Sequence, residues 1–553
     1  FYITHGAGCQ LTARKAKRIS ECDSAAALEW ALAHLSGCTC VGGSQPAISA
    51  EPPAAYRLLE TYLYEASVRL DIPVHQLTPE ALGSSNSVIP CPSYLLDSLT
   101  CRALVACAAR RLREKIEAGL AASVSTNNSI VHTAPHHDDI MLSYHGGMHD
   151  LLGRPHPGPA PEGASYPVPE LERTPSAALT VPLGEQMGGN VNHFAYLTSG
   201  FHSVNESYLQ AQCEACLAPA DDAAVAYFYT HPAQKLTFLD IAVRAGEISR
   251  DYDDLMSAFR AAFFRKDLKQ QDHIEHVIFL RKVAEVWNIA PTLALGALAA
   301  AIKEKILWLL NDYLPNHHPG DNIPKDIQIL KGCMRETEVD RVWAISRMPN
   351  NRVHHLRSKF YTDDFFTPMP SLEDDALPMA NLLKARQPNL ITVALDPEGT
   401  GPDTHYKVLL VVAAGLRIVL GRKDLANSNP LVWGYRNVWF EFTPSDCTLM
   451  IPVSSDDLDL MHDTFMSCFT TQKAASFPSP YHDGPFSSWS RSIQKRQKRL
   501  LRILLGEEYF QNHTDPRIRS SSGFIFIKAM FAEKFLQEVE QLKSKFENVA
   551  GAV

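Results

Sequence analysis

The chain has 553 residues, more than one simple core usually supports, so we expect two or three domains or one domain with large insertions. Hydrophobic residues make up 45% of the sequence and charged residues 20%, which is typical of soluble globular proteins. The formal net charge of -9 gives no reason to expect a nucleic acid or an anionic membrane surface as a partner.

The most apolar long stretch, Pro291 to Leu310, is interrupted by Lys303, Glu304 and Lys305. Charges near the centre of a membrane span are costly, so we predict a buried or amphipathic helix here and no membrane span. The first residues show no charged region followed by an apolar one, so we expect no secretory signal, and the 12 cysteines are scattered rather than spaced as zinc ligands. These features favour a cytoplasmic protein with reduced thiols.

Residues 1–125 carry apolar residues at helical spacing, with a loop rich in glycine, serine and proline at 42–53. Helices are predicted over Ala25–Leu35, Ala54–Leu70 and Leu95–Leu120. We therefore predict a mostly helical N-terminal segment.

The pattern then changes to that of an α/β domain, whose first part we predict at residues 126–202. Ser129–Ala134 is a short, mostly apolar run that is typical of a buried strand, and Ile140–Leu152 is predicted as a helix. A loop rich in proline and glycine, Gly153–Gly189, leads to a second strand at Asn192–Leu197. A strand that delivers polar residues to a following helix is the usual active-site geometry of an open α/β sheet.

Residues 203–322 show a helical pattern again, and we interpret them as an insertion into the α/β domain. The clearest predicted helices are Tyr252–Phe264, Gln271–Trp287 and Thr292–Leu314.

The alternation of strands and helices resumes at residues 323–510, the predicted second part of the α/β domain, and residues 511–553 are predicted as a helical tail. This alternation predicts a Rossmann-like, mainly parallel sheet with helices on both faces. The elements expected here are helices at Asp326–Asp340, Leu372–Arg386, Ser454–Cys468 and Ser487–Leu505, and strands at Arg341–Ile345, at Asn389–Leu395 and within Leu431–Phe442.

Two polar clusters follow predicted strands. Pro135 to Asp139 reads Pro-His-His-Asp-Asp, and Pro402 to His405 reads Pro-Asp-Thr-His at the start of a helix. The carboxyl ends of parallel strands share one edge of the sheet, so we expect the clusters to converge. Histidine and aspartate are suitable zinc ligands, and the metal lowers the pKa of water and polarises a carbonyl group. The alternative is that the aspartates cap helices and the histidines lie at the surface.

The first cluster resembles the Pro-His-Pro-Asp-Asp motif of the LmbE/PIG-L family, which contains zinc-dependent N-deacetylases acting on N-acetylglucosamine groups. Phe194 to Gly200 looks like the family's second strand and its turn, and Met334 to Glu338 resembles its Arg-x-x-Glu helix. Asp403-Thr-His405 resembles the distal His-Pro-Asp-His motif. The resemblance covers about residues 129–202 and 323–500.

The resemblance implies that His136, Asp139 and His405 bind Zn²⁺ or another divalent metal, and that Asp138 is the general base. Asp138 and Asp139 are adjacent and can point in different directions, so that one carboxylate coordinates while the other accepts a proton. The substrate-binding or supporting residues that it implies are His137, Arg335, Glu338 and Asp403.

The sequence departs from the family pattern in three places. His137 stands at the motif's proline, and Ile140 stands where an acidic residue often follows. The third departure is the absence of the first histidine of the distal motif, which in the family is expected to stabilise the tetrahedral intermediate; Gly401 and Pro402 occupy its region. The histidines considered as its replacement are His354, His355 and His482.

A finer resemblance concerns long proteins in which an LmbE-like domain follows a glucosamine-6-phosphate deaminase (isomerase) domain. The runs Leu395 to Thr400 and Trp433 to Trp439 look like this subgroup. The resemblance implies that residues 1–125 are the remnant of, or the linker from, an upstream isomerase-like domain. Within the second run, Trp433, Tyr435 and Trp439 alternate as in a core strand or as in a stacking surface for a sugar.

Three functions follow from these patterns. The favoured one is a metal-dependent hydrolase that removes the acyl group from a small-molecule partner, an N-acetylated amino sugar or amino-sugar phosphate. The second is an auxiliary part of a glucosamine-6-phosphate deaminase/isomerase protein. The third is a catalytically degenerate module that binds a sugar or a partner protein. Bound metal separates the first from the third, and release of acetate rather than ammonia separates the first from the second.

Overall fold

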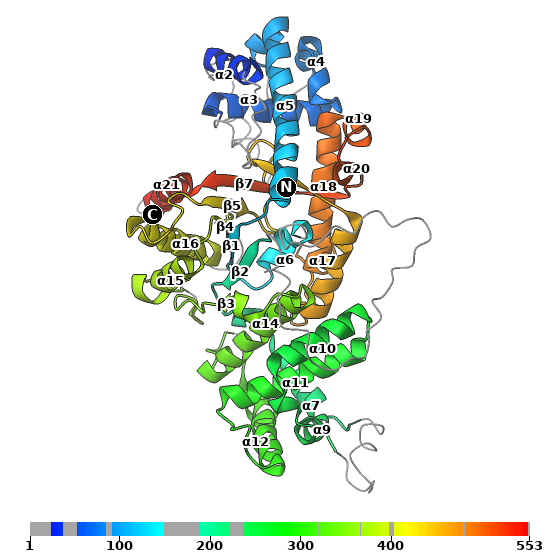
Figure 1. The fold of residues 1–553 in the computed structure, drawn as a ribbon, viewed down its shortest axis with the longest axis vertical. Helices are drawn as coiled ribbons and strands as arrows, with labels where there is room; N and C mark the ends of the chain where they lie inside the picture. Colours follow the sequence, from blue (N-terminus) through cyan, green and yellow to red (C-terminus); the bar gives the residue numbers. More distant parts are fainter. Residues whose placement is uncertain are drawn as a thin grey trace.

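The computed structural model describes residues 24–36, 52–84, 91–148, 189–220, 236–318, 320–364, 366–397, 403–478 and 482–550. Three parts follow one another along the long axis of the molecule (Figure 1): N-terminal helices, a central sheet with its covering helices, and a helical block. The predicted loop Gly153–Gly189, except for its last residue, lies outside the described residues, as do Gly401 and Pro402.

A seven-stranded sheet lies at the centre, in the order β3-β2-β1-β4-β5-β7-β6. β1 pairs in parallel with β2 and β4, β2 with β3, and β4 with β5, whereas β7 runs antiparallel to both β5 and β6. The predicted fold class, α/β with a mainly parallel sheet, is confirmed. The strands are β1 (Ser129–Ala134), β2 (Val191–Tyr196), β3 (Val353–His355), β4 (Leu390–Ala394), β5 (Leu431–Tyr435), β6 (Leu449–Val453) and β7 (Gly523–Phe531).

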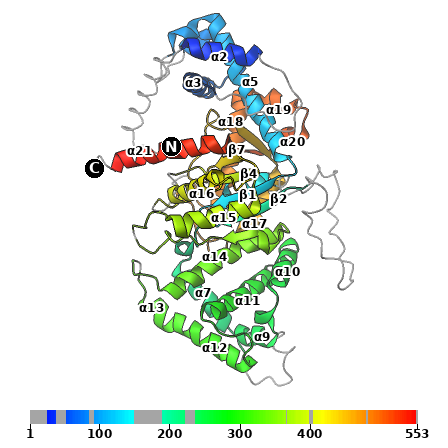
Figure 2. The ribbon, with the colours of Figure 1, turned by 60° about the vertical axis from the view of Figure 1, so that its left-hand side comes forward.

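Helices cover both faces of the sheet, so neighbouring side chains of one strand enter different cores. Ile130 of β1 packs in a core with residues of α14 and α17, while Val131 packs in a core with residues of α16. Figure 2 shows α15 and α16 beside the strands. Burial on both faces explains why β1 and β4 are apolar runs rather than alternating ones. The covering helices are α14 (Lys325–Ile345), α15 (Leu377–Arg386), α16 (Thr404–Gly421), α17 (Ser455–Cys468), α18 (Phe486–Leu505) and α21 (Ala532–Ala550).

The three helices predicted at the N-terminal end are present as α2 (Ser24–Ser36), α3 (Ala54–Leu70) and α5 (Ser98–Ser123). Their apolar faces form a core that continues onto β6, β7 and α18. α5 lies so close to β6 that a Cβ on Gly119 would be 2.3 Å from the carbonyl oxygen of Met450. The shorter elements here are η1 (Val74–Gln76), α4 (Pro79–Ser84) and η2 (Ser93–Leu96).

The helical block lies between β2 and β3 in the chain. Its predicted helices are present, the last of them as α12 followed by a π-helical turn, η6. α14 leads from the block back onto the sheet, where it packs against α17. The elements are η4 (Phe201–Ser203), α7 (Glu206–Leu217), α9 (Phe238–Arg244), η5 (Glu247–Ser249), α10 (Tyr252–Phe264), α11 (Leu268–Val286), α12 (Leu295–Trp308), η6 (Leu309–Tyr313) and α13 (Leu314–Asn316).

The strand predicted at Arg341–Ile345 is wrong, because these residues are the last turns of α14. All five residues are buried, as in a helix enclosed on every side, and an apolar run of this length is equally compatible with a buried strand or a buried helix. The strand of this region is β3, which follows the short turn η7 (Asn350–Arg352).

Two further predictions need correction. The helix predicted over Ile140–Leu152 is the short α6 (Asp139–Ser143), and η3 (His145–Gly147) follows it, with Gly147 packed closely on Ile525 of β7. The predicted helical tail includes β7, because its apolar residues fill the place between β5 and β6.

The strand predicted within Leu431–Phe442 ends at Tyr435. The remaining elements are η8 (Leu372–Ala376), α19 (Glu507–Gln511) and α20 (Pro516–Arg519).

Among the described helices, α16 is long and apolar enough to cross a membrane, by length and composition. In this structure 67% of it is buried within the protein, and it covers one face of the sheet. The stretch Pro291–Leu310, predicted not to span a membrane, does not meet the same measure.

Candidate metal centre

The two polar clusters meet at the carboxyl ends of the central strands. β1 ends at Ala134, shortly before His136 and Asp139, and β4 ends at Ala394, in the segment that leads to His405. From β1 the strand order proceeds towards β3 on one side and, through β4, towards β6 on the other. Open α/β sheets bind ligands in the crevice at such a change of direction.

The loop after β1 and a residue beyond β5 together hold the Asp139 carboxylate. The backbone N–H of His136 donates to Oδ2 of Asp139 at 2.6 Å. The side-chain amide of Asn437 donates to the other carboxylate oxygen, Oδ1. Because Asp139 is buried and both of its oxygens are engaged, the orientation of its carboxylate is fixed.

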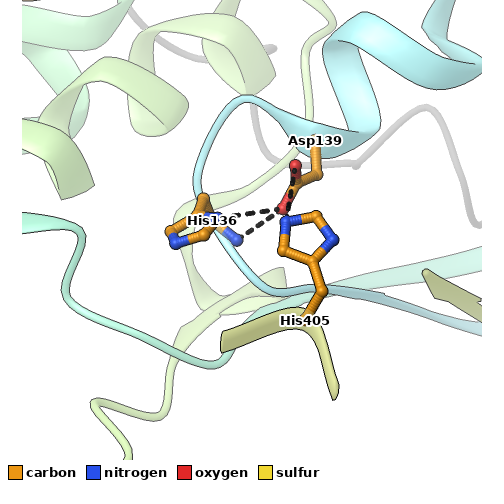
Figure 3. A group of neighbouring side chains, drawn as sticks. All are labelled: His136, Asp139 and His405. Carbon is orange, nitrogen blue, oxygen red and sulfur yellow. Dashed lines mark hydrogen bonds and ion pairs between the residues drawn. The ribbon is translucent and has the colours of Figure 1, made fainter. Parts of the chain in front are cut away.

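His136, Asp139 and His405 form a group whose candidate ligand atoms all lie within 4.8 Å of one another. Nδ1 of His136 is 3.7 Å from Oδ2 of Asp139, and Nε2 of His405 is 3.8 Å from Oδ1. Figure 3 shows both rings beside the carboxylate. Nε2 of His405 is buried without a hydrogen-bond partner, as expected of a nitrogen that a metal would complete. The predicted convergence is confirmed, and two imidazoles with one carboxylate are a donor set that suits zinc.

Asp396, which was not predicted as a site residue, fixes the ring of His405. Its Oδ1 is 2.8 Å from Nδ1 of His405, and its Oδ2 accepts the backbone N–H of Asn437 at 3.1 Å. A carboxylate on one ring nitrogen leaves the other nitrogen free for a metal, the usual arrangement around metal-binding histidines. The feature of the sequence that could have identified Asp396 is its position directly after β4, which matches the position of the first cluster after β1.

Burial and neighbouring carboxylates shift the pKa values of the group. Burial raises the pKa of Asp139 to about 7 and lowers the pKa of His136 well below its ordinary value. Burial alone would lower the pKa of His405, but the carboxylates of Asp139 and Asp396 outweigh it and raise that pKa to about 9. His405 therefore carries a proton at neutral pH in the metal-free protein, and a cation has to displace it.

Asp138 lies beside the three candidate ligands, and its partner is Arg335. Nη2 of Arg335 is 3.4 Å from Oδ2 of Asp138, and the side chain of Asp138 is 19% exposed to the cleft described below. Arg335 is buried and pairs with Glu338, one turn further along α14. Glu338 in turn accepts the backbone N–H of Thr471 at 2.7 Å. Arg335 thus contacts the predicted general base directly, and Glu338 contacts it through Arg335.

The remaining two predicted residues, His137 and Asp403, have partners other than the three candidate ligands. The buried ring of His137 stacks on Tyr196, with ring centroids 5.2 Å apart. Asp403 precedes α16 with a left-handed backbone, and its carboxylate pairs with Lys407 at 2.8 Å. Neither residue belongs to the group of candidate metal ligands.

An open cleft of about 750 Å³ lies at the group, within the usual size of small-molecule sites. Among the described residues that line it, none is His354, His355 or His482, the replacements considered for the missing distal histidine. His202 does line it, together with Tyr361, whose ring meets that of His136 edge-on at 6.1 Å. Neither His202 nor Tyr361 was predicted, although His202 follows β2 closely, as the first cluster follows β1.

The alternating aromatic residues near β5 separate into two environments. Trp433 and Tyr435 are buried in the core that also contains residues of α14 and α17. Trp439 lies beyond the end of β5, is partly buried and lines the cleft beside Phe486, with ring centroids 5.9 Å apart. Of the three aromatic side chains, Trp439 is therefore the one placed to contact a bound ligand.

Comparison with known proteins finds a relative described as a glucosamine-6-phosphate deaminase-like protein, from Bacteroides thetaiotaomicron, which is 24% identical over 210 residues. The match covers 37% of this chain and 30% of that protein, so the chain spans less than a third of the relative's length. No family model and no solved structure matches the chain. The similarity agrees with the predicted resemblance to proteins of that description.

Proposed function

We propose that this chain is a metal-dependent hydrolase of the LmbE/PIG-L type, which removes the acyl group from an N-acylated amino sugar. The observation that carries the proposal is the convergence of His136, Asp139 and His405, with Asp138 beside them, at the carboxyl edge of a mainly parallel sheet. The name of the relative supports an amino sugar as the kind of substrate.

The residues divide the chemistry among them. His136, Asp139 and His405 would hold a divalent cation, which would supply Lewis-acid polarisation of the amide carbonyl and lower the pKa of water. Asp138 accepts a proton from the attacking water and passes it to the amine nitrogen as the C–N bond breaks. Arg335 orients Asp138 from 3.4 Å away. His202 lines the same cleft, and its Nε2–H donates to the carbonyl of Thr362 at 3.0 Å. We propose that Nδ1 of the protonated ring, 3.7 Å from Oδ1 of Asp363, donates to the developing oxyanion in place of the missing distal histidine.

Metal content tests the ligand set. Protein purified without chelator is expected to hold about one zinc ion per chain, because three protein ligands suffice for a catalytic zinc site. His136→Ala and His405→Ala are expected to lose the ion. His318→Ala, which removes an exposed histidine outside the group, is the matched control and is expected to keep it. Wild-type protein without any divalent metal would instead support the degenerate module.

Product analysis separates the two enzyme hypotheses. Acetate release from N-acetylated amino sugars is expected with the metal-loaded protein, and Asp138→Asn is expected to lower kcat by about 10²-fold or more while the metal stays bound. The name of the relative is the observation that favours an auxiliary part of a deaminase protein. Ammonia without acetate would support that function and defeat the hydrolase proposal.

A further inference from the structure

The cleft at the metal group is lined by negative charges. Asp138, Asp139, Asp363 and Asp364 contribute four carboxylates, whereas none of the described lining residues is a lysine or an arginine. A bound divalent cation would offset two of these charges and leave the cleft negative. Because a cleft focuses the field of the charges that line it, an anionic group entering here meets a repulsive potential.

Two cationic side chains beside the lining residues are already paired. Arg335 pairs with Asp138 and Glu338, and Lys407 pairs with Asp403 and donates to Thr367. These cations are therefore not free to bind a phosphate group.

A neighbouring cavity does contain basic residues, but acidic residues line it as well. Lys325 and Lys359 line that cavity, and the segment 361–364 lines both it and the cleft. This shared segment carries Asp363 and Asp364. Arg357, which also lines the neighbouring cavity, is held by both carboxylate oxygens of Glu336 at 2.6 and 2.7 Å. A ligand that extends from the cleft into the neighbouring cavity along their shared wall therefore passes Asp363 and Asp364.

The other lining residues suit an uncharged, hydroxylated ring. Tyr361, Trp439 and Phe486 offer aromatic surface, and Asn322 and Gln472 offer neutral amides. Apolar faces with a few polar groups are the usual way in which a small molecule without a net charge is bound and oriented.

We propose that the carboxylates lining this cleft make it select an uncharged N-acyl amino sugar over the same sugar carrying a 6-phosphate. The inference rests on the proposed hydrolase function and specifies its substrate class. It places this chain apart from the phosphorylated sugar in the relative's name.

The test compares methyl N-acetylglucosaminide with the 6-phosphate of the same methyl glycoside on the full, zinc-loaded chain. Both kcat/KM and the equilibrium dissociation constant are measured, and the neutral sugar is expected to be favoured about tenfold or more in each, because the cleft repels the phosphate dianion. Equal or tighter binding of the phosphate would overturn the inference, whether or not either sugar is hydrolysed. Preferred binding of the neutral sugar without hydrolysis would support the inference and overturn the hydrolase proposal.

A variant that removes one charge and a change of salt concentration together distinguish electrostatic exclusion of the phosphate from steric exclusion. Asp364→Asn is expected to reduce the preference for the neutral sugar over the phosphorylated one about threefold. Raising the salt concentration from about 50 mM to about 500 mM is expected to reduce the same preference, since exposed charges are screened. Glu304→Gln removes an exposed charge that does not line the cleft, and is expected to leave the preference unchanged. A preference that responds to neither Asp364→Asn nor salt would overturn the charge-based selection.

Discussion

A single carboxylate, that of Asp396, decides how His405 faces the metal group. It is fully buried, and its two oxygens are divided between the imidazole of His405 and the backbone of Asn437. Since Asn437 also donates to Asp139, the two candidate ligands Asp139 and His405 share one supporting network. The network holds the ligand atoms in place before any ion arrives.

We expect Asp396→Asn to weaken zinc binding about 10- to 100-fold, the usual effect of losing the carboxylate behind a metal-binding histidine. The amide is a weaker acceptor and can turn its NH₂ group towards Nδ1, so that the His405 ring is less firmly oriented. Competition with a chelating dye measures the affinity, and circular dichroism checks the fold. The control is Asp403→Asn, whose carboxylate pairs with Lys407 outside the ligand group and whose loss is expected to leave the affinity unchanged. An unaltered affinity in Asp396→Asn would contradict the role assigned to it.

Zinc binding is expected to strengthen as the pH rises from about 6 to about 8. The pKa of His405 is raised to about 9, so a proton occupies the ring in the metal-free protein throughout this range and must leave before the nitrogen can coordinate. Release of the His405 proton predicts a dissociation constant that falls up to about tenfold per pH unit above about pH 7, and below it the proton of Asp139, whose pKa is about 7, steepens the fall. Titrations at three pH values measure this slope, and an affinity independent of pH would count against the proton on His405.

At the scale of elements, the contact between α5 and β6 joins the N-terminal helices to the sheet. Gly119 permits this contact, because a Cβ there would lie 2.3 Å from the carbonyl oxygen of Met450 and 2.8 Å from its backbone nitrogen. Backbone atoms cannot move aside as the end of a flexible side chain can. The helix or the strand would have to shift instead.

Gly119→Ala is therefore expected to lower the free energy of unfolding by about 1–3 kcal/mol, the usual cost of overpacking, although alanine is the better helix former. Gly296→Ala in α12 is the matched control. A Cβ there meets nothing within 4 Å, so we expect no loss and a gain of up to about 1 kcal/mol. Chemical denaturation of both variants measures the difference, and equal stabilities would show that the helix and strand separate without cost.

Two elements illustrate what local sequence patterns leave undecided. The end of α14 and the strand β7 are both apolar runs, and each was predicted as the other type of element. The end of α14 is buried on every side of the helix, so its sequence shows no helical periodicity. For β7 the decisive factor was a place in the sheet between β5 and β6, two strands that precede it in the chain by many residues.

At the scale of the whole molecule, the metal group depends on a sheet whose adjacent strands β1 and β4 are separated in the chain by the helical block. The predicted division at residues 125, 202, 322 and 510 stays a prediction. Whatever the domain boundaries, an ion bound by His136, Asp139 and His405 would link the segment after β1 to the start of α16.

Removing the metal is accordingly expected to lower the Tm, because an ion that binds the folded state stabilises it by RT ln(1 + [L]/Kd), about 2.7 kcal/mol at about 100 times Kd. Thermal unfolding of the zinc-loaded protein before and after chelation measures the shift. His136→Ala is expected to show no such shift, since it lacks a ligand. A wild-type Tm unaffected by chelation would contradict a site that spans the two segments.

The sequence by itself determined the features that depend on neighbours along the chain. Continuous apolar runs located the central strands β1 and β4, and apolar periodicity located most of the helices, because burial of both faces or of one leaves a local pattern. The motif at Pro135 to Asp139 and the distal His405 identified the candidate ligands, since each cluster follows a strand.

The tertiary structure alone decided the features that depend on residues far apart in the chain. The hydrogen bonds of Asp396 and Asn437, the presence of His202 in the cleft and the helical end of α14 depend on partners brought together by folding. The acidic lining of the cleft is of the same kind, because its carboxylates come from separate loops. Local patterns record whether a side chain is buried, whereas the identity of its spatial neighbours is set by the packing of the whole chain.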